Sequence, residues 1–466
     1  MIYVHVPFCR SFCTYCGFYS EAAPRCRRSE DILRQEIRLE EYVSALEAEI
    51  RTRQNDIRRV FASSGVNTLY IGGGTPSVLP LPLFGRLIAA LKDIGHPCGF
   101  EEFTVEVNPE DIVEKGPEYV RGLVALGVNR VSMGVQSFDD GILKWMNRRH
   151  SADQAVQAYR MLEEAGVDNI SIDLIFGLSQ MDDDLWRETL SKALSISASG
   201  RPPKHISAYQ LSVEEDSMLE KLIEKGKWSE ASDEVCERQY AILCETLAAA
   251  GYNHYEISNY AQPGFEAVHN SAYWSHRPYV GLGPGAHSYL VQADTFSIHD
   301  SPVCSEGPLP TKLGPSPCSC CRRLLAAKVH WTVCEPLERV GKCHLHTSGF
   351  AVSAESIRQD SVAYAESIRQ WNDPDLKGYL AAAQNGNFAD VQGSETLDQE
   401  QLIMEKVMLG LRTAAGVPEP YLRSTCDESL IDESLGNGNL VRLADGNIRI
   451  PENRFFISDT IISSII

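Results

Sequence analysis

Six short apolar runs, each followed by a longer amphipathic stretch, organise the first 290 residues of the chain. The runs are IYVHV, NTLYIGGG, FTVEVNP, RVSMGVQS, ISIDLIFG and HISAYQLS. Strands that alternate with helices build a parallel sheet with right-handed crossovers. We therefore predict an α/β fold, a partial (β/α) barrel of the TIM type. We expect its strands to be apolar on both faces because helices cover the outside.

The remainder of the chain divides into two further predicted segments. Residues 291–368 are rich in Pro, Ser and Cys, lack periodicity and contain AESIRQ twice, at 354–359 and 365–370. This segment is interpreted as an atypical insertion, disordered or anomalous in sequence. Residues 369–466 show helical patterns and a hairpin with an Asp-Gly turn, which predict a small C-terminal α+β domain. The expected domains are thus 1–290, 291–368 and 369–466.

Charge and cysteine content narrow the class of protein. The formal net charge is −20, which argues against a nucleic-acid partner because phosphate binding needs a basic face. No run approaches the ~18 apolar residues of a transmembrane helix, and the first residues read as a strand and not as a signal peptide. We therefore expect a cytoplasmic protein, in which the 14 cysteines are metal ligands or free thiols.

Three of these cysteines, Cys9, Cys13 and Cys16, form a C-x-x-x-C-x-x-C frame directly after the first predicted strand. Structural zinc normally takes four protein ligands, and a [4Fe–4S] cluster also needs four iron ligands. Three cysteines without a nearby fourth leave one iron open to a ligand that is not protein. Taken alone, the frame is also compatible with a chance triplet or an unusual zinc loop.

Polar residues follow the other predicted strands. Three glycines and a threonine stand in GGGTP at 72–76, and the later runs carry Glu106, Gln136, Arg148 and Asp173. Any one of these taken alone is read as a solvent-exposed strand end. Because the carboxyl ends of parallel barrel strands meet at one face, we expect the four to lie together there.

The segment Tyr3 to Cys16, YxHxPFCxxxCxYC, resembles the signature of radical S-adenosylmethionine (SAM) enzymes. The resemblance implies that the three cysteines bind a [4Fe–4S] cluster and that SAM chelates the fourth iron. Further residues of this chain match positions that contact SAM. Tyr15 matches the residue that packs on adenine, and Arg148 suits the SAM carboxylate. The implied cofactor-binding set is Tyr3, Tyr15, Gly73, Gly74, Thr75, Glu106, Gln136, Arg148 and Asp173.

Longer motifs resemble the coproporphyrinogen III dehydrogenase superfamily, over residues 1 to about 290 and again over 369–466. They are YIGGGTPS, EVNPE, NRVSMGVQSF, IDLIFGL, HISAYQLSVE, YEISNYA and HNSAYW followed by YVGLGPGAHS. The superfamily includes an oxygen-independent dehydrogenase of haem synthesis and HemW-type haem chaperones. The dehydrogenase carries a further cysteine where this chain has Phe18, and an extension ahead of the first strand, which here starts at Met1. Both departures favour the chaperone.

The motif HNxxYW, 269–274, also resembles the chaperones, and the resemblance implicates His269 in haem binding. A neutral imidazole is a good axial ligand of iron, and Tyr and Trp can flank a macrocycle. Without the resemblance, His269 is read as a core histidine in an aromatic cluster. His254 and His287 are alternatives, each more readily read as structural.

The predicted function is that of a haem chaperone that holds haem, a [4Fe–4S] cluster and SAM. Its partners would be haem and haem-acceptor proteins, respiratory ones among them, with peripheral contact at a membrane. No catalytic residue is assigned. The rivals are the coproporphyrinogen dehydrogenase itself and a radical SAM enzyme with another substrate. The chain departs locally from the family at Ser179-Gln180-Met181, which replaces the usual Pro-x-Gln. The insertion also offers possible zinc ligands, which are Cys318, Cys320, Cys321, Cys334, Cys343 and His346.

Overall fold

The computed structural model describes residues 1–22, 29–95, 99–215, 217–292 and 366–466. The predicted insertion therefore falls almost wholly outside the described residues, and so does its candidate zinc site. The division into three domains stays a prediction. Among the helices in the described ranges, none is both long enough and apolar enough to cross a membrane.

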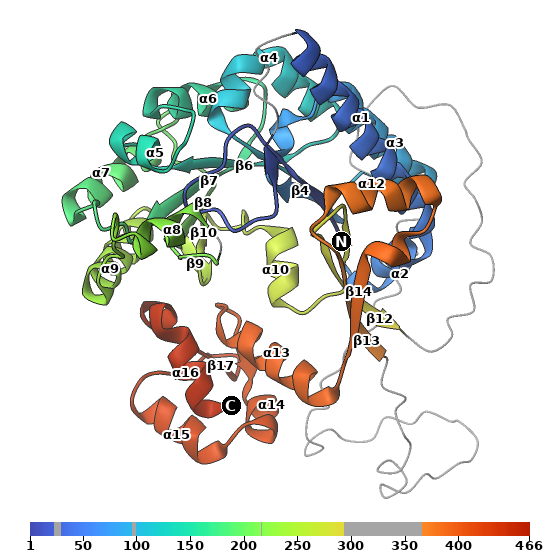
Figure 1. The fold of residues 1–466 in the computed structure, drawn as a ribbon. Coiled ribbons are helices and arrows are strands. Elements are labelled where there is room, and N and C mark those ends of the chain that lie inside the picture. Colours follow the sequence, from blue (N-terminus) through green and yellow to red (C-terminus); the bar gives the residue numbers. More distant parts are fainter. Residues whose placement is uncertain (23–28, 96–98, 216, 293–365) are drawn as a thin grey trace, which may run out of the picture. The chain divides into compact units, whose positions relative to one another are not determined.

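A nine-stranded sheet forms the centre of the fold (Figure 1), and all six predicted runs are strands in it. Its neighbours run parallel from β11 to β8, and β10 and β9 add an antiparallel edge, so the barrel is partial as predicted. In spatial order the strands are β11 (Val280–Leu282), β1 (Ile2–Val6), β4 (Thr68–Gly73), β5 (Glu102–Val107), β6 (Arg130–Gln136), β7 (Asn169–Phe176), β8 (His205–Gln210), β10 (Asn259–Ala261) and β9 (Asn253–Glu256).

Most of the helices in this part of the chain follow the strands and cover the outer face of the sheet (Figure 1). Local capping explains where several of them begin: Ser151 and Gln154 form a capping box at α6, and the Asp182 carboxylate accepts from the Leu185 amide at α7. The helices are α1 (Ser29–Thr52), α2 (Gln54–Ser64), α3 (Leu81–Asp93), α4 (Pro109–Ala125), α5 (Asp140–Trp145), α6 (Ala152–Glu164), α7 (Asp183–Leu194), α8 (Met218–Glu224), α9 (Asp233–Ala249) and α10 (Val268–Trp274).

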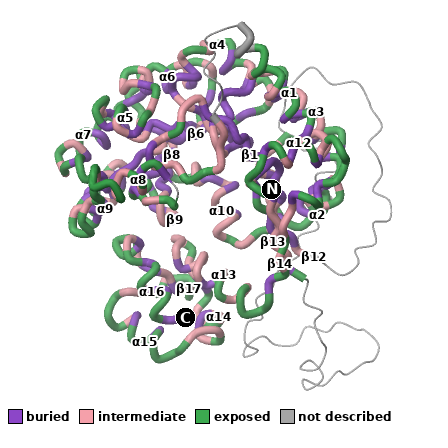
Figure 2. The backbone as a smooth tube through the Cα atoms, in the orientation of Figure 1, coloured by how far each residue is buried: buried purple, intermediate pink, exposed green. Residues whose placement is uncertain are grey.

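The strands are not apolar on both faces, so that expectation was wrong. In β6, Val131, Met133 and Val135 are buried in the hydrophobic core, whereas Arg130 and Ser132 line a cavity. Side chains of a strand alternate between the two faces of the sheet. The outer face therefore packs against the helices, and the inner face encloses a polar lumen. Figure 2 shows how strongly burial is concentrated in these strands.

Residues from 366 onward form small antiparallel sheets and helices, as predicted for the C-terminal part. One sheet has the order β12 (His287–Gln292), β13 (Glu366–Asn372) and β14 (Gln392–Leu397). The predicted Asp-Gly hairpin is formed by β16 (Val441–Arg442) and β17 (Asn447–Arg449), beside β15 (Val417–Pro418). The helices are α12 (Leu376–Asn385), α13 (Gln399–Leu411), α14 (Glu419–Thr425), α15 (Glu428–Gly436) and α16 (Ser458–Ile465).

A buried carboxylate joins α1 to this later part of the chain. Glu49 is fully buried and accepts hydrogen bonds from the Asn372 side-chain amide at 2.8 Å, the Tyr379 hydroxyl at 2.7 Å and the Gly283 amide at 2.8 Å. A buried carboxylate is stable only when its oxygens are satisfied in this way. Segments far apart in the sequence thus share one polar contact.

Candidate functional site

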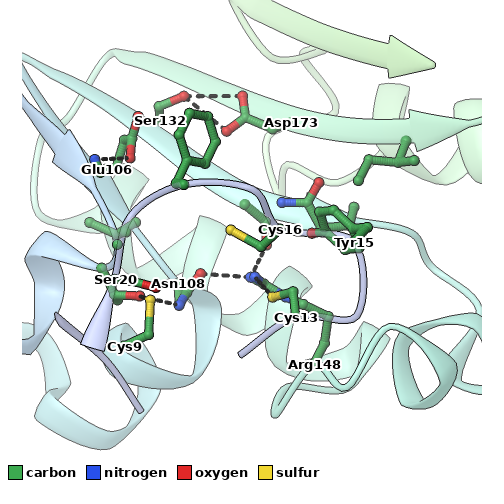
Figure 3. Close-up of a pocket in the computed structure, with 18 of the residues that line it drawn as sticks. Cys9, Cys13, Tyr15, Cys16, Ser20, Glu106, Asn108, Ser132, Arg148 and Asp173 are labelled. Carbon is green, nitrogen blue, oxygen red and sulfur yellow. Dashed lines mark hydrogen bonds between the residues drawn. The ribbon is translucent and has the colours of Figure 1, made fainter. Parts of the chain in front are cut away.

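A cavity of about 520 Å³ opens at the carboxyl ends of the strands and runs into the lumen of the partial barrel (Figure 3). The loop that carries the three cysteines lines it, together with side chains of β4 to β8 and the start of α4. In parallel α/β folds the ends of several strands meet at this face, which is where loops build binding sites. The cavity is therefore the first candidate for a cofactor site.

All three predicted cysteine ligands line this one cavity. Cys9 Sγ and Thr75 Oγ1 share a hydrogen bond at 3.4 Å, and the Arg148 guanidinium donates to Cys13 Sγ at 3.4 Å. Burial raises the pKa of Cys16 to about 11 and also raises that of Cys9. The Cys9 and Cys16 thiols therefore stay protonated at neutral pH until a metal displaces the protons.

The donor set fits an iron–sulfur cluster better than one small ion. Within the ranges that the structure describes, no three His, Cys, Asp or Glu side chains are gathered around a single metal-sized point. The three thiols line one cavity of about 520 Å³, and a buried guanidinium beside Cys13 would offset their negative charge after deprotonation. Cysteine thiolates are the usual ligands of such clusters. Cys9, Cys13 and Cys16 are the residues that would hold one.

The glycine loop touches the cysteine segment directly. Gly73 has a φ of +106°, and a Cβ at this position would lie 2.7 Å from the His5 ring. At Gly74, an added Cβ would lie 2.8 Å from the Phe8 carbonyl oxygen. Both positions thus require glycine because the loop packs closely against the first strands. Gly73, Gly74 and Thr75 all line the cavity, as predicted from the motif.

Arg148 reaches the cavity from the segment between α5 and α6, and not from a strand end. Besides Cys13, it donates to Asn108 Oδ1 at 2.6 Å and to the Gly134 carbonyl at 2.7 Å. Its Nε is buried without a hydrogen-bond partner among the described residues. The side chain is thereby held in one orientation with donor capacity to spare, which suits an anionic group in the cavity.

Two carboxylates face the same space. Glu106 accepts from the Tyr70 hydroxyl at 2.7 Å and from the Gly73 amide at 3.1 Å, and burial raises its pKa to about 7. Asp173 lies within β7 and not at its end, and the Ser132 hydroxyl donates to its two oxygens at 3.0 and 3.1 Å. Burial raises the pKa of Asp173 as well. Their remaining lone pairs can accept hydrogen bonds from hydroxyl or ammonium groups.

Tyr15 and Gln136 also line the cavity, whereas two other predicted residues do not. The Tyr3 hydroxyl forms a hydrogen bond with Nδ1 of His5 at 2.9 Å. The Tyr3 ring contacts the cavity through Tyr70, whose ring centre is 6.1 Å away. His269 is fully buried on α10. The structure thus gathers the predicted set except for these two.

The surroundings of His269 are those of a core histidine. Its Nδ1 bonds the Thr68 hydroxyl at 2.8 Å, and its Nε2 bonds the Tyr273 hydroxyl at 2.8 Å. Burial lowers the pKa of His269 to about 3, so the imidazole is neutral. The two alternatives are also engaged by aromatic rings: His254 stacks on Tyr260 and His287 on Trp371. Haem ligation by His269 stays a prediction.

Several cavity residues were not predicted from the sequence. Asn108 bridges Thr75 and Arg148, and Ser132 holds Asp173. The signal for Asn108 was present, because it stands in the EVNPE motif two residues after Glu106. The signal for Ser132 and Arg130 was the alternation of polar and apolar residues in RVSMGVQ.

Comparison with known proteins agrees with this site. Residues 3–193 match the Radical SAM superfamily. The heme chaperone HemW of Lactococcus lactis is 33% identical over 288 residues, which are 62% of this chain and 69% of that protein. The heme chaperone HemW of Bacillus subtilis is 33% identical over 305 residues, 64% of this chain and 72% of that protein.

A solved structure extends the likeness to the fold as a whole. Coproporphyrinogen III oxidase (HemN) from Escherichia coli, a radical SAM enzyme, covers 99% of this chain and 89% of its own, with a TM-score of 0.64. At 19% identity this likeness concerns the fold alone. The cysteine loop, the glycine loop and the sequence relatives agree, and the chain belongs to the radical SAM superfamily and, within it, to the HemW family.

Proposed function

We propose that this protein binds haem and delivers it to acceptor proteins, and that it also holds a [4Fe–4S] cluster and SAM. The observation that carries the cofactor part is the single cavity shared by three thiols, with no fourth cysteine among the residues that line it. The haem part rests on the relatives, whose printed name is heme chaperone HemW.

The chain's own residues have separate tasks in this proposal. Cys9, Cys13 and Cys16 bind three irons, and Arg148 orients the carboxylate of SAM by a two-point contact. Glu106 and Asp173 accept from the ribose hydroxyls or the ammonium group. When bound, the cluster supplies one-electron chemistry toward SAM.

Haem ligation is assigned to His269, whose neutral imidazole is suited to iron. In the described conformation Nε2 is taken by the Tyr273 hydroxyl, so ligation requires that this hydrogen bond open. The variant Tyr273→Phe removes the hydroxyl and keeps the aromatic ring. It should therefore preserve or strengthen haem binding, whereas His269→Ala should weaken it.

Titration of the anaerobically reconstituted protein with haem tests this assignment through the Soret band. His205→Ala is the matched control, since His205 is also a fully buried histidine packed against an aromatic ring. Equal loss of haem binding in His269→Ala and His205→Ala, or loss in Tyr273→Phe, would contradict ligation by His269. Failure of the wild-type protein to bind haem would refute the haem proposal itself.

The cluster assignment has its own test. Cys13→Ala should lose the brown chromophore and most of the iron after reconstitution. The matched control is Cys236→Ala, because Cys236 is a free buried thiol on α9, outside the cavity. Full iron content in Cys13→Ala would refute the ligand set.

One assay separates the proposal from its main rival, the coproporphyrinogen dehydrogenase. The reconstituted protein is incubated anaerobically with SAM, a reductant and coproporphyrinogen III. Formation of protoporphyrinogen would refute the chaperone proposal in favour of the enzyme. We expect none above the rate of a Cys13→Ala control.

A further inference from the structure

Arg130 is a buried guanidinium whose charge nothing in the described protein offsets by direct contact. It opens β6, is 1% exposed and lines the cavity. It has no hydrogen-bond or ion-pair partner among the described residues, and its Nε is buried without a partner. Because an unpaired buried charge costs several kcal/mol, such an arrangement requires a reason.

Elsewhere in the fold, the terminal nitrogens of another buried guanidinium are satisfied, although its Nε, like that of Arg130, has no hydrogen-bond partner among the described residues. Arg53 is 6% exposed and donates to the Gly281 carbonyl at 2.8 Å, to Ser288 Oγ at 3.2 Å and to Gln370 Oε1 at 2.9 Å. Partners for a buried arginine are thus available to this chain where the role is structural. Arg130 differs because its donors face a cavity.

Arg130 lies at the opposite end of the lumen from the cysteine loop. The strands run parallel, so the first residue of β6 stands at their amino ends. Gly134, whose carbonyl holds Arg148, is four positions further along β6, or about 13 Å at the usual strand rise. The two arginines therefore enter one cavity from different levels of its wall.

The groups beside Arg130 limit the ligand that it can take. A guanidinium offers a planar pair of donors that matches a carboxylate or a phosphate. Glu106 and Asp173 line the same cavity and form no direct ion pair with Arg130, although its charge acts to lower the pKa of both. They already accept hydrogen bonds from Tyr70 and Ser132. These two acids oppose a dianion more than a monoanion, and they accept from hydroxyl or ammonium groups.

We propose that Arg130 binds the carboxylate of a ligand that enters the lumen beneath the cysteine loop, a second anion subsite besides Arg148. Next to its carboxylate, the ligand either carries hydrogen-bond donors for Glu106 and Asp173, or has a shape that leaves these two carboxylates hydrated. In the proposed function, on which the choice of ligand rests, Arg148 already takes the single carboxylate of SAM, so the expected source is a propionate of haem. A SAM carboxylate held by Arg130 instead is the alternative outcome of the test.

Equilibrium binding to the cluster-reconstituted protein distinguishes the sources. Affinities are measured for SAM and decarboxylated SAM, and for haem and haem dimethyl ester, in the wild type and in Arg130→Gln. We expect Arg130→Gln to weaken the binding of haem about tenfold to a hundredfold, the usual effect of losing a charged hydrogen-bond partner. The carboxylate-free form of that ligand should keep its affinity.

Two further variants keep the test decisive. Arg121→Gln is the matched control, because Arg121 is 52% exposed and pairs only with Glu118 on the outside of α4. Arg130→Lys keeps the charge without the planar fork, so it should show a smaller loss with the same dependence on the carboxylate. It also replaces Arg130→Gln if that variant fails to fold, as judged by circular dichroism and iron content.

Equal weakening of the carboxylate-bearing and carboxylate-free forms, or weakening of neither, overturns the proposal. Absence of binding by the wild type to both parent ligands overturns it as well. If the wild type binds SAM but not haem, the haem proposal fails and the SAM arm still decides the role of Arg130.

Discussion

Replacement of Glu106 by glutamine should stabilise the protein without cofactors while weakening its binding of SAM. The carboxylate is half-buried, faces the cavity and holds two hydrogen bonds, yet desolvation raises its pKa from 4.5 to about 7. The charged form is thus disfavoured in the folded state. Glutamine removes the charge and keeps the shape, so it removes this cost.

The size of the expected change in unfolding free energy, and its dependence on pH, both follow from the raised pKa of Glu106. Between pH 4.5 and 7 the folded protein holds a proton on Glu106 that the unfolded chain has lost, so the stability of the wild type falls as pH rises through this window. Each tenfold change in proton affinity is worth about 1.4 kcal/mol, which gives about 3 kcal/mol above pH 7. Water in the cavity screens the charge, and we expect about 1–3 kcal/mol.

The assay is chemical denaturation of the cofactor-free chain, wild type and Glu106→Gln, under reducing conditions at pH 5 and pH 8. The variant should gain stability over the wild type at pH 8 and lose most of that gain at pH 5. The matched control is Glu188→Gln, because Glu188 is an exposed carboxylate on α7. A difference between variant and wild type that does not change with pH would refute the raised pKa and the reasoning built on it.

Three further predictions concern other parts of the described chain. Glu49→Ala should destabilise the fold by roughly 3–9 kcal/mol in chemical denaturation, since three buried donors lose their acceptor at about 1–3 kcal/mol each. An effect as small as that of Glu41→Ala, at an exposed position of the same helix, would contradict this. Arg148→Lys should weaken SAM about tenfold in equilibrium dialysis with iron content retained, and unchanged affinity would exclude Arg148 from the SAM site. Phe18→Cys should leave the iron content per chain unchanged, because the side chain is 72% exposed, and extra iron would show that position 18 supplies a ligand.

The central strands could be predicted from the sequence because each is a run of β-branched and apolar residues bounded by turn residues. The short strands β9, β10 and β11 were missed. They have three or four residues each. Their pairing, of β11 with β1, of β10 with β8 and of β9 with β10, stabilises them more than any local preference does. Strand pairing between β12 and β13 also joins positions on either side of residues 293–365, which no local pattern indicates.

The prediction that the strands are apolar on both faces failed because their inner faces line a polar lumen. In β6 the apolar residues Val131, Met133 and Val135 alternate with Arg130 and Ser132, and this period of two already indicated a strand with one polar face. The residues at the mouth of the cavity were easier to predict, because glycines and charged residues after apolar runs are conspicuous in a sequence. The contacts of His269 with Thr68 and Tyr273 depend on how α10 packs, which sequence spacing does not reveal.

The cavity contains both negative and positive groups whose burial destabilises the folded protein. Glu106 is desolvated and Arg130 has no partner in the described chain, so each costs stability in the protein without ligands. Natural sequences tolerate such local conflicts mainly at functional sites. A ligand that satisfies these groups binds only the folded state, so it should raise the unfolding temperature as its concentration exceeds Kd. Glu106→Gln removes one of these costs beforehand, and SAM should therefore raise the unfolding temperature of that variant less than it raises that of the wild type.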